Sequence, residues 1–505
     1  MSTRRSFLRA GMGAVTATGL LGAGGFAAAV GSPRGWRRLG EELTGRLVLP
    51  SDADYDLARQ LASAQFDSIR PRAIAYCQTA EDVRTCVRFA QDHDIHATPR
   101  SGGHSFTGWS TTEGLVIDVS RLKQVRVEGD RVRLGAGGQA DDVATALAPH
   151  GVSLPAGLCP TVSAGGFITG GGLGWQTRMF GPASDQVVSA EVVLADGRIV
   201  RCSDRENADL YWALRGGGGG NFGIVTEFEM AAGTVTRAAT FSLSWPFDAA
   251  AEVISSWQRW IGAAPERLAS GMGVLLRDAE PAAVPKVLVS GAFFGPRAEL
   301  EELVGALVSE AGSQPLTRTV AEKTYHEALM ALYGCAGKTV DQCDLVGHNP
   351  EATLPRENYV RHRSRMFNRP WPRSGVDDAL AAFDADRRAG QYRWLGLLSL
   401  GGNANKPAEN ATAYVHRDAE FFSVYSLGLN AGHTGEEDRR AGELWVDGGF
   451  AAFDPHSNGR TYSNYPDTEL PDWRTAYYGR NHPRLAAIKK KYDPHGFFRF
   501  PQAVA

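Results

Sequence analysis

The sequence of 505 residues has almost no excess of charge of one sign, few cysteines and, after its first thirty residues, no long apolar run. Lys and Arg number 53 against 56 Asp and Glu, which gives a formal net charge of −3. Because binding to phosphates requires a basic excess, nucleic acid is not expected as a partner. No later stretch approaches the ~20 apolar residues that cross a bilayer.

The sequence also lacks the common metal-binding patterns. Its six cysteines form no CxxC pair, and there is no HExxH motif. A zinc site is therefore not expected, and we assign no metal ligands. Cys335 and Cys343 lie close together in a turn-rich stretch, where they form either a disulfide across a short loop or two buried thiols.

What the sequence does contain is typical of a soluble globular protein with one compositional excess. Hydrophobic residues make up 43% and charged residues 22%, and the length allows two or three domains. Glycine is in excess, at 59 of 505 residues against about 7% expected. The glycines are clustered, which indicates a backbone that comes close to a ligand.

Residues 1–32 have the features of an export signal. Arg4 and Arg5 precede an apolar Gly/Ala-rich stretch, and small residues near 27–31 offer cleavage sites. This pattern predicts a twin-arginine signal, and therefore a bacterial protein carried by the twin-arginine export machinery to the periplasm or cell exterior. A single transmembrane anchor is the alternative; six glycines in the stretch argue against a stable anchor.

The pattern of short strands and helices predicts an α+β first lobe over residues 50–234 rather than a doubly wound parallel sheet. A helix over 80–93 begins at a capping Thr79. Val187–Leu194 and Ile199–Arg201 flank an Asp-Gly turn, which predicts a β-hairpin.

Residues 235–455 differ, because long strands alternate with helices, and they predict a second domain in which helices cover a sheet. The expected strands include 286–294, 392–400 and 411–425, and the expected helices include 249–261, 297–311 and 376–388. Five tryptophans here suit either a carbohydrate site or an ordinary core: Trp257, Trp260, Trp371, Trp394 and Trp445. Residues 456–505 are expected to return to the first lobe.

One glycine run, Gly218–Gly223, formally satisfies the GxGxxG fingerprint. That fingerprint requires a strand before it and a helix after it, so that the helix N-terminus holds a pyrophosphate. Here a helix is expected over 209–214 and a strand over 224–228, which is the inverse order. Rossmann-type binding of NAD is therefore rejected, and no GxxxxGK[ST] motif supports a P-loop.

Two other glycine-rich tracts surround reactive side chains. His104 lies in Arg100-Ser-Gly-Gly-His-Ser105, and Cys159 opens a tract that runs from Gly157 to Gly174. Glycine lets successive backbone N–H groups point into one concavity, where they form a nest for pyrophosphate. His104 and Cys159 could therefore both reach one bound dinucleotide.

At these residues the chain resembles the FAD-linked oxidases of the berberine-bridge-enzyme-like family, within the vanillyl-alcohol-oxidase superfamily. The RSGGHS loop, the GLCPTVSAGGFITGGGLG tract, the segment 209–227, and the C-terminal motifs YSNYPD and AYYGRN all match, in the family's order. The resemblance covers the first lobe and the tail, and the second domain matches only weakly. It implies a two-lobed PCMH-type FAD-binding domain plus a substrate domain of antiparallel sheet covered by helices.

The resemblance also implies bicovalent FAD, bonded through His104 to the 8α-methyl group and through Cys159 to C6 of the isoalloxazine. It further implies that the cofactor contacts are made by Arg100, Ser101, Gly102, Gly103, Ser105, Gly165, Gly166, Gly170, Gly174, Gly223, Ile224, Val225, Tyr478 and Asn481. Asn221 and the glycines beside it are expected to shape the backbone rather than to take part in chemistry.

Tyr465, in the YSNYPD motif, is implied to be the general base. If Tyr462–Tyr465 is extended, alternate side chains face opposite ways, so Tyr462 and Tyr465 do not share a face. A phenol with a pKa lowered from about 10 to about 7 needs ~4 kcal/mol of extra phenolate stabilisation. Leu173 stands where some related oxidases have a second tyrosine, which argues against a two-tyrosine mechanism.

These expectations describe an oxidase that transfers hydride from a hydroxyl-bearing carbon of a sugar or secondary metabolite to flavin N5, with O2 reduced to H2O2. Two alternatives stay open. One is a flavin dehydrogenase that uses an acceptor other than O2, and the other is an exported ligand-binding protein on the same fold.

Overall fold

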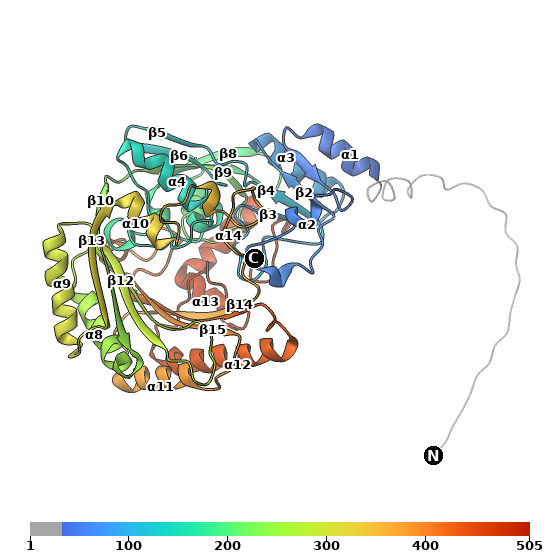
Figure 1. The fold of residues 1–505 in the computed structure, drawn as a ribbon. Helices are drawn as coiled ribbons and strands as arrows, with labels where there is room; N and C mark the ends of the chain where they lie inside the picture. The colour runs from blue at the N-terminus through green and yellow to red at the C-terminus, as the bar shows by residue number, and fades with distance from the viewer. Residues whose placement is uncertain (1–32) are drawn as a thin grey trace, which may run out of the picture.

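The computed structural model describes residues 33–505 (Figure 1), so the expected export signal lies outside the described part of the chain. The described chain forms three sheets of four, five and seven strands. Among its helices, none combines the length and the apolar character needed to cross a membrane. The mixture of helices with mainly antiparallel sheets confirms the predicted α+β class.

The four-stranded sheet lies at the N-terminal end of the molecule, in the order β1-β2-β4-β3. Its strands are β1 (Arg46–Val48), β2 (Ala73–Tyr76), β3 (Ala97–Arg100) and β4 (Leu115–Asp118). Helices α1 (Pro33–Glu42) and α3 (Ala80–Asp92) pack together beside it. Thr79 caps α3 by accepting a hydrogen bond from the Asp82 backbone N–H, which confirms the predicted cap.

The five-stranded sheet is antiparallel throughout, in the order β5-β6-β9-β7-β8. Its strands are β5 (Val125–Glu128), β6 (Arg131–Gly135), β7 (Val187–Val193), β8 (Ile199–Ser203) and β9 (Ile224–Ala231). The predicted hairpin is the β7–β8 pair. The run Gly218–Gly223 lies between helix α7 (Ala208–Leu214) and strand β9, so the element order that excludes a Rossmann site is confirmed.

The seven-stranded sheet is also antiparallel, and one of its faces carries a layer of helices (Figure 1). Its strands, in spatial order, are β13 (Thr317–Thr324), β10 (Arg237–Pro246), β12 (Lys286–Phe293), β11 (Leu268–Leu276), β15 (Gln391–Ser399), β16 (Phe421–Leu429) and β14 (Val360–Phe367). The covering helices are α8 (Ala250–Ala263), α9 (Arg297–Glu310), α11 (Arg373–Asp384) and α12 (Glu436–Phe453).

Burial decides between the two interpretations of the tryptophans in this part of the chain. Trp257, Trp260, Trp371 and Trp445 are at most 6% exposed and belong to the main hydrophobic core. Trp394 is only partly buried and packs at a separate cluster. Four of the five tryptophans therefore stabilise the layer of helices on the sheet instead of forming a ligand surface.

The predicted strand over 411–425 is wrong in its first half, because β16 begins at Phe421. The backbone of the preceding residues is bonded to other parts of the chain. The N–H of Ala413 donates to the Trp212 carbonyl, that of Tyr414 donates to the Arg215 carbonyl, and Asn481 Nδ2 donates to the Thr412 carbonyl. These tertiary hydrogen bonds replace the sheet pairing that the apolar pattern predicted.

The C-terminal segment packs on the first lobe, as expected. Helix α14 (His482–Tyr492) contacts α7, and the backbone N–H of Val504 donates to Asn221 Oδ1 at 2.9 Å. Lys489 Nζ donates to the Asn221 carbonyl at 2.7 Å and to Asp493 Oδ2 at 2.6 Å. Asn221 is thus a structural anchor for the end of the chain.

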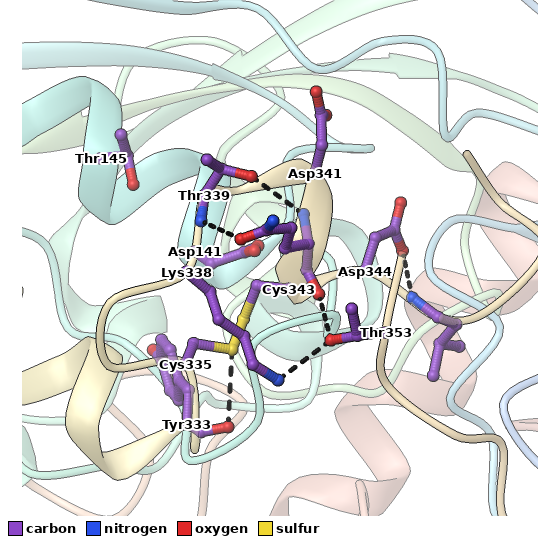
Figure 2. Close-up of a disulfide and its surroundings, with 12 residues drawn as sticks. Asp141, Thr145, Tyr333, Cys335, Lys338, Thr339, Asp341, Cys343, Asp344 and Thr353 are labelled. Atoms are coloured by element: carbon purple, nitrogen blue, oxygen red, sulfur yellow. Dashed lines mark hydrogen bonds between the residues drawn. A yellow bond between two sulfur atoms is a disulfide. The ribbon is translucent and has the colours of Figure 1, made fainter. Parts of the chain in front are cut away.

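Cys335 and Cys343 form a disulfide, which settles the choice left open by the sequence. Figure 2 shows the bridge beside Tyr333, Asp141 and Thr353. The hydroxyl of Tyr333 donates to the Gly157 carbonyl at 3.2 Å, two residues before Cys159. The bridge therefore braces a segment that contacts the cysteine-containing tract.

Replacing both bridge cysteines with alanine is expected to lower the free energy of unfolding by about 2.5 kcal/mol, because the unfolded chain gains the entropy of an open loop. Denaturant unfolding with and without a reductant measures this change. The reductant should shift the wild-type midpoint and leave the double variant unmoved; equal midpoints for the two oxidised proteins would contradict the prediction.

Candidate active site

The two predicted cofactor loops lie against each other. His104 Nε2 and Thr161 Oγ1 are 2.8 Å apart, which joins the loop after β3 to the cysteine tract. Gly102 lies so close to Ser163 that an added Cβ would be 2.7 Å from Ser163 Oγ and 2.9 Å from its backbone nitrogen. Residues that are 57 positions apart in the sequence therefore form one site.

Gly102→Ala is expected to separate these loops, since the new methyl group would meet backbone atoms that cannot move aside. Overpacking of this kind costs about 1–3 kcal/mol, and the bond between His104 and Thr161 should weaken with it. Thermal unfolding and bound-flavin content measure the two effects. Gly305→Ala is the matched control, because that glycine lies in α9 with no atom within 4 Å of the added Cβ.

Unpaired polar groups and bare backbone line the same region. Gly166, in helix α5 (Ala164–Thr169), and Gly219 are both exposed, and a Cβ on Gly219 would lie 3.6 Å from Gly166 Cα. The buried Ser163 Oγ has no hydrogen-bond partner within residues 33–505. Side-chain-free backbone beside an unsatisfied hydroxyl fits the close approach of a dinucleotide such as FAD.

The electrostatic setting of His104 favours the neutral imidazole. Burial lowers its pKa to about 4, and a nearby His348 adds to this effect, while Thr161 opposes it. A neutral imidazole keeps one nitrogen lone pair, which a bond to the flavin requires.

Cys159 has an exposed side chain, yet burial by surrounding atoms raises the pKa of its thiol, and Glu357 raises it further. Exposed surface and desolvation occur together when a side chain lines a deep recess instead of the outer surface. The exposed surface of the Cys159 side chain gives a ligand access to its sulfur. The thiol stays protonated at neutral pH.

Tyr465 lies in an aromatic cluster with contributions from three parts of the chain. Its ring centroid is 5.1 Å from Phe106, 5.0 Å from His362 and 5.0 Å from Phe422. Burial raises its pKa, and Cys159 and Tyr462 raise it further. Within residues 33–505, each influence on this pKa raises it, so the phenolate stabilisation that a lowered pKa needs is not provided there.

The expectation that Tyr462 and Tyr465 face opposite ways is wrong. The Tyr465 N–H donates to the Tyr462 carbonyl at 2.8 Å, so the segment is a turn, and the two rings stack at 6.0 Å. The Tyr462 hydroxyl accepts hydrogen bonds from the Gly172 N–H and from Asn464 Nδ2. The turn thus docks the C-terminal motif onto the glycine tract.

Several other predicted cofactor residues have structural partners. The Arg100 guanidinium forms a buried ion pair with Asp118 and donates to the Ala58 carbonyl, although its Nη1 has no partner within residues 33–505. Ser105 Oγ accepts from the Trp109 N–H inside its own loop. Asn481 Nδ2 donates to the carbonyls of Glu409 and Thr412. None of these contacts brings the polar group to His104 or Cys159.

The remaining predicted cofactor residues pack against neighbouring parts of the chain. Gly103 has a left-handed φ of 69° and sits against Leu61, and Gly165 lies next to Ser101. Gly170 lies against the Asn464 amide, and Gly174 against the Ala156 carbonyl. Strand β9 begins with Ile224 and Val225 directly after Gly223, and the Tyr478 hydroxyl lies near Gly218.

The sequence missed Thr161, Phe106 and His362. Thr161 and Phe106 lie in or beside the matched motifs, so their neighbours provided a signal. His362 lies on β14, in the part of the chain that matches no motif, and only the fold brings it to Tyr465.

A well-defined cavity of about 320 Å³ lies elsewhere, between α4 (Ala140–Leu147), α5 and α10 (Tyr325–Leu332). Its lining is apolar and includes none of His104, Cys159 and Tyr465. It borders the cysteine tract through Gly157, Val162, Ala164, Phe167 and Ile168, but none of the three reactive side chains lines it. No group of three or more His, Cys, Asp or Glu in residues 33–505 could hold a metal ion.

Comparison with known proteins agrees with this arrangement. Residues 71–203 match the family model of an FAD binding domain, and residues 461–505 match the model named "Berberine and berberine like". The chain is 30% identical over 470 residues to an uncharacterized FAD-linked oxidoreductase, YgaK, of Bacillus subtilis, covering 92% of this chain and 97% of the relative.

Two further relatives carry names that state a substrate. The chain is 30% identical over 465 residues to a glucooligosaccharide oxidase of Sarocladium strictum, with 85% of this chain and 86% of the relative covered. A solved structure of chitooligosaccharide oxidase matches with a TM-score of 0.81 at 25% identity, over 93% of this chain and 99% of that one.

Proposed function

Because the chain belongs to the berberine-bridge-enzyme-like family of FAD-linked oxidoreductases, we propose that it is an oxidase acting on a hydroxyl-bearing carbon of a sugar or secondary metabolite. When bound, FAD supplies a hydride acceptor at N5 and passes the electrons to O2, giving H2O2. The observation that carries the proposal is the convergence of the His104 loop, the Cys159 tract and the Tyr465 turn, which are joined by the contacts His104–Thr161, Gly172–Tyr462 and Phe106–Tyr465.

We assign the attachment of FAD to two covalent bonds, one from His104 and one from Cys159. Thr161 orients the His104 imidazole, and the exposed backbone of Gly166 and Gly219 leaves room for the pyrophosphate. Two bonds fix the ring relative to Tyr465 and prevent loss of the cofactor where no free FAD replaces it. Correct alignment of reacting groups is a large source of rate acceleration.

Tyr465 takes the hydroxyl proton of the substrate as the neighbouring C–H bond gives up its hydride. Its ring and that of Phe106 are both partly exposed and offer aromatic surface against which a sugar or another ring can lie. Sugars are the first substrate class to test, since two similar proteins are named as oligosaccharide oxidases.

We further propose that the protein is bacterial and is exported folded by the twin-arginine route to the periplasm or cell exterior. The disulfide between Cys335 and Cys343 supports an oxidising destination, because such bonds are rare in reducing cytosol.

A peroxide-coupled screen over mono- and oligosaccharides and polycyclic alcohols tests the function. The expected result is H2O2 formation with one class under air. Flavin reduction without peroxide would assign a dehydrogenase, and folded protein isolated without flavin would favour a ligand-binding protein and overturn the proposal.

A further inference from the structure

The cavity beside the cysteine tract is enclosed by one face of each of three helices. The wall residues recur at positions i and i+4: Val143 and Leu147 on α4, Ala164 and Ile168 on α5, Tyr325 and Leu329 on α10. Because such positions lie on the same side of a helix, each helix turns an apolar face toward the cavity. Leu134 of β6 and Met230 of β9 close it on the side of the five-stranded sheet.

The interior of this cavity offers little to a polar ligand. Among the described residues that line it, none is Asp, Glu, Lys or Arg. Ser153 Oγ already accepts a hydrogen bond from Gln176 Nε2 at 3.0 Å. His326 Nε2 lies 3.0 Å from Thr145 Oγ1, and the Tyr325 hydroxyl is inaccessible to water. Since a buried sugar or charged molecule needs hydrogen-bond partners, the interior fits neither class.

The rim of the cavity differs from its interior, because polar side chains reach solvent there. Thr236 and Thr324 both line the cavity and are exposed, and His326 is partly exposed. The Tyr325 N–H donates to the Thr236 carbonyl at 2.8 Å, which holds the start of α10 beside this rim. A ligand can therefore enter here and keep one polar group in contact with the threonines or with water.

The volume of the cavity is large for the interior of a folded protein. Protein cores are packed so closely that few voids exceed the size of a water molecule. An apolar cavity of ~150 Å³ already stays dry and takes up benzene or xenon. The present cavity, at about 320 Å³, is larger and has room for a molecule with two fused rings.

We propose that this cavity is a second ligand site, which binds a small uncharged molecule with one or two apolar rings and a single hydroxyl group. The rings lie among Val143, Phe167 and Ile168, and the hydroxyl lies at the rim beside Thr236 and Thr324. None of the three reactive side chains lines this site. Binding here therefore requires neither turnover nor the proposed function.

Calorimetric titration of the protein as purified with 2-naphthol tests the site, because the carbon that bears this hydroxyl has no hydrogen to give up as hydride. One molecule is expected to bind per chain. Ala144→Phe should weaken binding about tenfold or more, since its ring fills the cavity. Ala146→Phe is the matched control, because Ala146 lies on the same helix, is exposed and does not line the cavity. Equal affinity of the two variants, or no binding to the wild type, would overturn the proposal.

Xenon diffraction locates the site without any variant, so it decides the proposal even if Ala144→Phe fails to fold. A crystal of the wild-type protein under xenon pressure should hold xenon between Val143 and Ile168. A cavity that stays empty at a pressure that fills other apolar voids would overturn the proposal. Absence of peroxide formation with every sugar and alcohol tested would remove the proposed oxidase function and leave this result unchanged.

Discussion

Replacing both His104 and Cys159 with alanine is expected to make all of the flavin extractable by acid, whereas wild-type protein is expected to keep all of its flavin in the precipitate. The reason is that covalent bonds survive unfolding and the contacts of a folded site do not. Each single variant should retain flavin through the remaining bond. Visible absorbance of the supernatant and mass spectrometry of tryptic peptides measure the outcome.

Cys202→Ala is the control for this experiment, because Cys202 is a free and fully buried thiol on β8. It should retain flavin to the same extent as the wild type. The double attachment is disproved if yellow wild-type protein yields the peptides containing positions 104 and 159 at their unmodified masses. Flavin bound at only one of the two positions would restrict the assignment to that residue.

Tyr465→Phe is expected to lower kcat by 10²- to 10⁴-fold, the usual contribution of a positioned acid–base group. The substitution keeps the ring that packs on Phe106 and Phe422, so the fold and the flavin content should not change. Steady-state kinetics with the substrate found by the peroxide screen, together with the flavin spectrum, separates loss of chemistry from loss of structure.

Tyr359→Phe provides a comparison, because its hydroxyl donates to Glu443 of α12 and does not belong to the aromatic cluster. Its turnover should equal that of the wild type. Full activity of Tyr465→Phe with an unchanged pH dependence would remove Tyr465 from the mechanism.

Local patterns were sufficient to predict much of the first lobe. The cap at Thr79, the Asp-Gly hairpin and the inverted order around Gly218–Gly223 depend on residues close in sequence, and the structure has all three. The meeting of the Gly102 and Ser163 loops is a tertiary contact. It was expected because His104 and Cys159 each lie in a glycine-rich tract, and both tracts are suited to bind the same dinucleotide.

The failures have a common physical cause. Residues 411–420 have the apolar pattern of a strand, but distant carbonyls and Asn481 take their hydrogen bonds. Tyr462–Tyr465 reads as extended, but a backbone hydrogen bond closes it into a turn. His362 has no signal in its own strand, because its importance comes from rings that are distant in sequence. Nonlocal partners decide these three cases.

The anchoring of Asn221 by a distant part of the chain has a consequence for the order of folding. Lys489 and Val504 bind Asn221, beside the loop that carries Gly219, across sequence separations of 268 and 283 residues. Contacts between residues so far apart carry a large entropy cost of loop closure. This side of the glycine loop is therefore expected to become ordered late in folding, after the elements on either side have formed.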